Sequence, residues 1–294
     1  MSLPVTIIGG YLVAGKTRLL NRILSGGHGQ RIAVIVNDFG ALNVDAGLIV
    51  SHEGDTVSLS NGCVCCSASD GTGEVLKSFI RREADFDRIL IEMSGVAEPA
   101  RLAQLVAAFQ LPVDGVIVMA DAEQLPAQLA NRYSGRSVAR SLAQADLILV
   151  NKIDLVDTDA LARTETALER HAPGVRHIRS RSGDVLAEVL FGQGHGLSEQ
   201  SFDHGDHSQI YESWDWHRED GVSRDELAML AASLAVRAVR AKGHVALRED
   251  PQTRYLYQQV GPRWTLEADG GWGIAQPQSH IVAIGIRLGA ALNP

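Results

Sequence analysis

Cysteine is scarce in this 294-residue chain, and its placement is informative. All three cysteines, Cys63, Cys65 and Cys66, lie within four consecutive positions. Thiols this close together cannot join distant parts of a fold, so a disulfide scaffold is excluded. The clustering favours a loop that chelates a metal ion through reduced thiols.

Several other features are also missing from the sequence. No apolar stretch reaches the roughly 20 residues that a helix needs to span a bilayer. The N-terminus lacks the basic segment and the cleavage site of a signal peptide. Dense lysine and arginine runs are absent and the net charge is −8, which argues against a nucleic-acid-binding protein. We therefore expect a cytoplasmic protein with neither a membrane nor a nucleic acid as partner.

The first motif follows the short apolar run Val5–Ile8, which is typical of a strand. Residues Gly10–Thr17 read G-Y-L-V-A-G-K-T, the phosphate-binding-loop pattern G-x-x-x-x-G-K-S/T, and helical spacing follows in residues 18–24. Backbone N–H groups of such a loop surround phosphates, so we expect Lys16 to reach their outer oxygens and the Thr17 hydroxyl to bind Mg²⁺. An empty glycine-rich turn is the alternative, and the complete strand–loop–helix context argues against it.

Val13 is an awkward residue for this loop. β-branched residues resist positive φ, so a left-handed backbone at this position would weaken phosphate binding. The predicted nucleotide-binding residues here are Gly10, Val13, Ala14, Gly15, Lys16, Thr17 and Arg18.

Two more apolar runs lead into acidic residues. Ile32–Val36 predicts a strand buried on both faces, with Asp38 after it, and Arg88–Ile91 leads into Glu92 and Gly95. Ligands bind at the carboxyl ends of parallel strands, where we expect Glu92 to hold Mg²⁺ and the Gly95 N–H to contact the terminal phosphate. The role of Asp38 stays open between binding Mg²⁺, orienting water, binding a second metal ion and forming a solvated turn.

The apolar run 147–150 ends in the sequence N-K-I-D, residues 151–154. After such a strand, N-K-x-D indicates guanine, because the Asp154 carboxylate can accept both N1–H and the 2-amino group of that base. Adenine would leave the carboxylate unpaired, which costs roughly 10²- to 10⁴-fold in binding. We expect Asn151 to bond the base and the loop, and the Lys152 stem to cover the ring face.

The pattern predicts an α/β fold with a second, smaller part. Residues 1–190 are expected to form a P-loop NTPase domain with a mostly parallel sheet flanked by helices. Residues 191–209 are rich in Gly, Ser, His and Asp and are typical of a linker. Its histidines are either a weak metal site or incidental, namely His195, His204 and His207.

Residues 210–294 predict a small α+β domain with an antiparallel sheet. The sequence S-R-D-E at 223–226 is a capping box that opens a helix over Leu227–Leu234. Strands are expected at 236–241, 244–247, 255–260 and 280–286. All four tryptophans fall in this part, and core packing is their expected use, with a partner surface as the alternative.

In order and spacing, these motifs resemble those of the CobW-type family of metal-linked P-loop GTPases. The resemblance rests on residues 10–17, on N-D-F-G at 37–40, S-N-G-C-V-C-C at 60–66, E-M-S-G at 92–95, N-K-I-D at 151–154, R-A-K-G at 240–243 and Y-Q-Q-V-G at 257–261. The C-x-C-C element is the most specific, because other phosphate-loop families lack it. The chain departs from the family's common pattern at five positions. The family commonly has glycine in place of Val13, glutamate in place of Asp38, and threonine in place of Arg18, Met93 and Ser94.

The resemblance implies a slow GTPase that couples GTP hydrolysis to delivery of Zn²⁺, or of Co²⁺ or Ni²⁺, to a client metalloprotein. GTP and Mg²⁺ are the implied cofactors, and a homodimer is an open arrangement. The implied catalytic residues are Lys16, Thr17, Asp38, Glu92 and Gly95. The implied ligands of the transferred metal are Cys63, Cys65, Cys66 and Asp38. One alternative is a nucleotide-modulated metal buffer or sensor without turnover. Another is a small-molecule kinase, against which the N-K-x-D motif argues.

Overall fold

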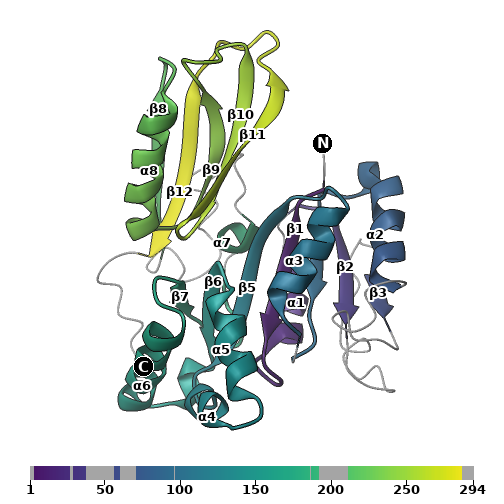
Figure 1. Ribbon diagram of the computed structural model, residues 1–294, viewed down its shortest axis with the longest axis vertical. Coiled ribbons are helices and arrows are strands. Elements are labelled where there is room, and N and C mark those ends of the chain that lie inside the picture. The colour runs from purple at the N-terminus through teal and green to yellow at the C-terminus, as the bar shows by residue number, and fades with distance from the viewer. Residues whose placement is uncertain are drawn as a thin grey trace. The chain divides into compact units, whose positions relative to one another are not determined.

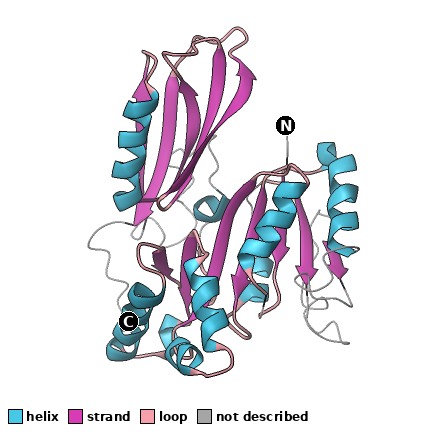
Figure 2. Ribbon diagram, viewed as in Figure 1, coloured by secondary structure: helices cyan, strands magenta, loops and turns pink. Residues whose placement is uncertain are grey.

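The computed structural model describes residues 3–26, 29–37, 56–59, 71–95, 97–185, 187–191 and 211–286. The chain forms two compact units that divide after residue 187 (Figures 1 and 2). The predicted domain boundaries at 190 and 210 stay a prediction, because residues 192–210 lie outside these ranges. Within the described ranges, no helix combines the length and apolar character that crossing a membrane requires.

The N-terminal unit is built on a seven-stranded parallel sheet with the order β3-β2-β4-β1-β5-β6-β7. Its strands are β1 Val5–Gly10, β2 Ile32–Asn37, β3 Thr56–Leu59, β4 Arg88–Glu92, β5 Val113–Asp121, β6 Leu147–Asn151 and β7 Arg176–Arg179. Its helices are α1 Lys16–Ser25, α2 Gly71–Arg81, α3 Pro99–Ala108, α4 Leu125–Ala130, α5 Gly135–Ala143 and α6 Thr158–His171, with 3₁₀ turns η2 Glu83–Asp85 and η3 Ile153–Leu155.

Burial explains why the strands of this sheet are continuous apolar runs. Every residue of β1, β4 and β6 is buried, as expected when helices cover both faces of a parallel sheet. β1 lies in the middle of the strand order, so the loop that follows it emerges at the centre of the sheet edge. The predicted fold class is confirmed.

A buried ion pair fastens three strands together at their amino ends. Arg88, at the start of β4, is 2% exposed. Its Nη1 donates to Asp114 Oδ2 of β5 at 2.7 Å and to Thr6 Oγ1 of β1 at 3.1 Å, and its Nε donates to Gln30 Oε1 at 2.9 Å. Burying two charges is tolerable here because they are paired and the guanidinium is further hydrogen-bonded.

The C-terminal unit is a five-stranded antiparallel sheet with the order β11-β10-β9-β12-β8. Its strands are β8 Tyr211–Arg218, β9 Ala238–Ala246, β10 Thr253–Val260, β11 Arg263–Gly271 and β12 Ser279–Ile286. Its longer helix is α8 Arg224–Arg237, and α7 Ala187–Phe191 is a single short helix. One face of the sheet forms a core with α8, into which Leu227, Ala231, Val245, Tyr257 and Ile281 are buried.

The predicted capping box opens α8. The Ser223 hydroxyl accepts from the Glu226 N–H at 3.2 Å, and the Glu226 carboxylate accepts from the Ser223 N–H at 2.7 Å. The Ser223 N–H and the Arg248 guanidinium lower the pKa of the Glu226 carboxyl to about 2. Because both donors favour the ionised form, the box is formed throughout the neutral pH range.

Two details of the C-terminal prediction are wrong. The strands expected at 236–241 and 244–247 are one strand, β9, since Lys242 and Gly243 continue the ladder with β12 and β10. The helix also runs three residues beyond Leu234 before β9 begins. Three tryptophans pack, partly buried, against the core beneath α8, as expected: Trp214, Trp216 and Trp264.

We expect Arg88→Met to lower the unfolding free energy of the N-terminal unit by about 3–5 kcal/mol, because it leaves the Asp114 carboxylate buried without its cation. The double variant Arg88→Met/Asp114→Leu should recover most of that loss. All four tryptophans lie beyond residue 210, so tryptophan fluorescence reports on the C-terminal unit alone. The urea midpoint followed by far-UV circular dichroism should therefore fall, whereas the midpoint followed by fluorescence should not change. An Arg88→Met variant as stable as the wild-type protein would contradict this account of the ion pair.

Candidate nucleotide site

The carboxyl ends of five strands, β1, β2, β4, β5 and β6, meet at one edge of the parallel sheet. In the strand register, Ile8 of β1 and Val36 of β2 both pair with Glu92 at the end of β4. Asn151 ends β6 opposite Asp121 of β5. The sheet therefore brings together residues that lie more than 140 positions apart in sequence.

The loop between β1 and α1 has the left-handed backbone that phosphate binding needs. Gly10, Val13 and Gly15 have φ values of 135°, 64° and 103°. Gly15 tolerates no side chain, because a Cβ atom there would lie 2.5 Å from Asn151 Nδ2. Val13 is 81% exposed and adopts a conformation that β-branched residues disfavour. The left-handed backbone that the sequence identified as unfavourable for Val13 is thus present in the structure.

Lys16 and Thr17 open α1 beneath this loop. The buried Lys16 ammonium donates to the Tyr11 carbonyl at 3.2 Å, so it already turns back over the loop. Thr17 Oγ1 donates to Glu92 Oε1 at 3.0 Å. A hydroxyl and a carboxylate side by side at a helix N-terminus are oxygen donors of the kind that Mg²⁺ prefers, and the pair fits that ion. Arg18 is exposed.

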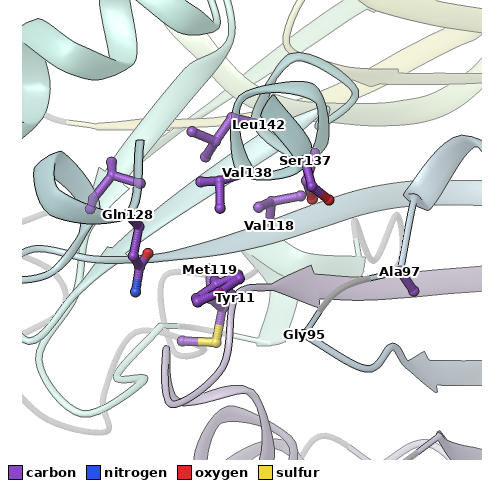
Figure 3. Close-up of a pocket in the computed structure, with 11 residues that line it drawn as sticks. Tyr11, Gly95, Ala97, Val118, Met119, Gln128, Ser137, Val138 and Leu142 are labelled. Carbon is purple, nitrogen blue, oxygen red and sulfur yellow. The ribbon is translucent and has the colours of Figure 1, made fainter. Parts of the chain in front are cut away.

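Gly95 lies directly against the phosphate loop. A Cβ atom on Gly95 would be 2.7 Å from both the backbone nitrogen and a methyl carbon of Leu12. Gly95 and Tyr11 also line a small pocket with Val118, Met119 and Val138 (Figure 3). Because the fit is this close, a movement of the segment after β4 must be felt by the loop after β1.

Asn151 ties together the two loops expected around a nucleotide. Its Nδ2 donates to the Ala14 carbonyl at 3.0 Å, and its Oδ1 accepts from the Gly183 N–H at 2.9 Å. The side chain is buried, so these bonds form in a low-dielectric setting. The expected contact with the loop is present, and both ends of the amide are engaged within the protein.

Lys152 is held by a residue that sequence reasoning missed. Its Nζ lies 2.6 Å from Asp121 Oδ2, and Asp121 Oδ1 accepts from the N–H groups of Glu123 and Gln124. Fixing the ammonium keeps the aliphatic stem in one place, as a platform for a base requires. Asp154 is exposed in η3. The signal for Asp121 was available, since it is another acid that ends an apolar strand.

The predicted ligands of the transferred metal lie outside the described residues, as do the linker histidines. These residues are Asp38, Cys63, Cys65, Cys66, His195, His204 and His207. Within the part of the chain that the structure describes, no three His, Cys, Asp or Glu side chains already form a metal-ligand set. The last residues of β2 and β3, Asn37 and Leu59, are register partners. The chain therefore continues toward Asp38 from β2 and toward the cysteines from its neighbour β3, and β2 lies between β3 and β4.

Two family models and several known proteins match the chain. The family model of the CobW/HypB/UreG nucleotide-binding domain matches residues 4–179, and that of the cobalamin synthesis protein cobW C-terminal domain matches residues 211–292. The chain is 32% identical to the zinc chaperone CobW of Pseudomonas aeruginosa over 98% of this chain and 89% of that protein. It is 30% identical to the zinc chaperone YjiA of Escherichia coli over 97% of this chain and 95% of that protein.

Among solved structures, the chain is similar to Zn(II)-bound YjiA GTPase from Escherichia coli. The sequence identity is 24%, the match covers 99% of this chain and 96% of that chain, and the TM-score is 0.44.

We expect Val13→Gly to tighten GDP binding roughly 3- to 30-fold. A left-handed backbone costs a residue with a Cβ atom about 1–2 kcal/mol. The free loop can relieve this cost and the bound loop cannot, so removing the Cβ atom favours the bound state. The greater conformational freedom of glycine in the free loop offsets part of this gain in affinity. Val13→Ala is the matched control, because it keeps the Cβ atom and should change affinity little. Calorimetric titration measures both. Unchanged affinity with a raised melting temperature would show that the strain is present in both states.

Proposed function

Because the chain belongs to the CobW/HypB/UreG family of nucleotide-binding proteins and carries the CobW C-terminal domain, we propose that it is a GTP-hydrolysing metallochaperone or metal-insertion factor. In this proposal, GTP hydrolysis drives delivery of Zn²⁺ to a client metalloprotein. The observation that carries it is the Thr17–Glu92 hydrogen bond, which joins the phosphate loop to β4. One strand, β2, separates β4 from β3, the strand that leads into the cysteines.

The proposed nucleotide chemistry uses residues on both sides of this bond. Lys16 neutralises charge on the outer phosphates, and the loop N–H groups hold them. Mg²⁺, when bound, screens the phosphate charge that builds up in the transition state, and Thr17 and Glu92 are its proposed protein-side oxygens. Gly95 is the proposed contact for the terminal phosphate, because its backbone packs on Leu12 of the phosphate loop.

Guanine selection is assigned to the N-K-x-D segment. Asp154 is the proposed acceptor for the two guanine donors, and Lys152, held by Asp121, is the proposed platform under the ring. Asn151 holds the phosphate loop and the loop at Gly183 in one frame. An adenine nucleotide would meet an acceptor where it also presents an acceptor, which disfavours it.

The coupling to metal is proposed to run through adjacent strand ends. β4 carries Glu92, its neighbour β2 leads into Asp38, and β3 leads into the cysteines. Three thiolates leave the fourth position of a tetrahedral Zn²⁺ open to Asp38, a histidine or a ligand from the client protein, whereas structural zinc sites are closed by four protein ligands. An open position suits an ion that must be handed to another protein.

A metal buffer or sensor, in which nucleotide only orders the fold, is the second candidate. It shares the cysteine site and differs in one measurable property, since its metal affinity does not depend on nucleotide. Coupled binding requires the metal affinity to differ between the GTP-bound and nucleotide-free states.

Purified protein with GTP, Mg²⁺ and Zn²⁺ should release phosphate slowly, on the order of 10⁻⁴–10⁻² s⁻¹ without a partner. Lys16→Ala should abolish this release, because it removes the only side-chain cation of the phosphate loop itself. The matched control is Lys77→Ala, an exposed lysine on α2 that pairs with Glu74. Phosphate release from Lys16→Ala equal to that of wild type would sink the hydrolysis proposal.

Cys65→Ala should weaken Zn²⁺ binding at least tenfold, because it removes one thiolate ligand, and should leave GTP affinity nearly unchanged in metal-free protein. Ser67→Ala is the control within the same stretch of sequence. Titration against a chromophoric zinc competitor, with and without a non-hydrolysable GTP analogue, measures both the site and its coupling. Equal zinc affinity in the two nucleotide conditions would favour the buffer over the chaperone.

A further inference from the structure

Three histidines stand directly opposite one another on adjacent strands of the C-terminal sheet. The register pairs His280 of β12 with His217 of β8 on one side and with His244 of β9 on the other. Directly opposite residues have Cβ atoms about 4.5–5.5 Å apart and point to the same face. The next residues, Ile281 and Val245, are buried in the α8 core. The histidines therefore occupy the face of the sheet away from α8.

Two of these imidazoles are close together and open to solvent. The ring centroids of His217 and His280 are 6.0 Å apart, and the side chain of His280 is 50% exposed. His280 Nε2 lies 2.8 Å from Asp215 Oδ1, and His217 Nε2 lies 3.1 Å from Gln278 Oε1. Carboxylate and amide oxygens only accept hydrogen bonds, so Nε2 carries the proton in both rings. In the neutral rings, the lone pair is then on Nδ1.

This arrangement matches the way proteins prepare histidines for metal ions. A metal-binding imidazole typically donates its other N–H to a carboxylate or carbonyl, which fixes the tautomer and raises its basicity. Two imidazoles that bind one ion at about 2.0–2.1 Å have ring centroids roughly 5 Å apart. The observed separation is slightly wider, so closing the site requires rotation of exposed side chains, which is fast and leaves the backbone in place.

The surrounding charges select one end of the histidine row. His244 Nε2 lies 3.1 Å from Asp269 Oδ2, and Asp269 also pairs with Arg254 at 2.8 Å. Arg254 disfavours a metal ion near His244, whereas Asp215 favours one near His217 and His280.

We propose that His217 and His280 bind a divalent transition-metal ion, Zn²⁺ or Ni²⁺, through their Nδ1 atoms, with Asp215 as the orienting carboxylate. Imidazole suits these ions, and a site with two protein ligands leaves positions for water or for a ligand from another molecule. The site is thus exchangeable, and it lies within the C-terminal unit. It does not depend on GTP hydrolysis or on the cysteines.

The test uses the full-length chain without nucleotide, with Cys63, Cys65 and Cys66 all replaced by serine. Titration of Zn²⁺ against a chromophoric competitor should show one site. His217→Asn and His280→Asn should each weaken it more than tenfold, because each removes one of two ligands. Asp215→Asn should weaken it roughly tenfold, as expected when a supporting carboxylate is lost.

Two controls make the result specific. His171→Asn on α6 makes the same chemical change elsewhere and should leave Zn²⁺ binding intact. His204→Asn/His207→Asn tests the linker in the same way. Unchanged affinity in both strand variants, or loss of the site in the linker variant instead, overturns the proposal. Tryptophan fluorescence confirms folding of the strand variants, because Trp214 and Trp216 share β8 with His217.

Discussion

One short strand, β4, carries the constraint on which the nucleotide unit depends. Its first residue, Arg88, is locked into a buried ion pair with Asp114, and its last residue, Glu92, accepts a hydrogen bond from Thr17. A strand rises about 3.3 Å per residue, so these two anchors are roughly 13 Å apart along a rigid, fully buried element. Fixing the amino end therefore also fixes where the carboxylate meets the phosphate loop.

The phosphate loop survives with an unfavourable residue because its surroundings determine its shape. The Ala14 carbonyl is held by Asn151, and the Ala14 N–H donates to the Tyr11 carbonyl. Gly95 packs against Leu12 on one side of the loop. Such over-determination lets a strained residue persist, and strain of this kind is common where a ligand binds. Val13 therefore keeps its strained conformation without distorting the loop, and it opposes ligand binding only to the extent that the unliganded loop can relax.

The parts of this architecture that the sequence predicted are those written in local patterns. Apolar runs ending in Asn37, Glu92 and Asn151 predicted buried parallel strands and the edge at which their polar ends meet. The Arg88–Asp114 pair was beyond reach, because its partners lie on different strands and no local pattern encodes their proximity. Asp121 was recognisable as an acid that ends an apolar strand, but its pairing with Lys152 was not. In the C-terminal sheet the strands that were missed, β8 and β11, are its two edges. Edge strands carry polar residues that weaken the apolar signal.

The arrangement of strand ends also limits how metal and nucleotide can influence each other. Any effect of GTP on metal affinity must be matched by an equal effect of the metal on GTP affinity, because the coupling free energy is shared. Within the proposed function, Glu92 is the element that both ligands would bias, since it touches Thr17 and its strand neighbours the one that leads into Asp38. An imidazole pair on the C-terminal sheet has no such link and would bind its ion independently of the nucleotide. Three thiolates hold Zn²⁺ more tightly than two imidazoles, so an ion passed between such sites moves spontaneously toward the cysteines. Within the proposed function, the step that needs energy is then release of the ion from the thiolates, which is the step that GTP hydrolysis would drive.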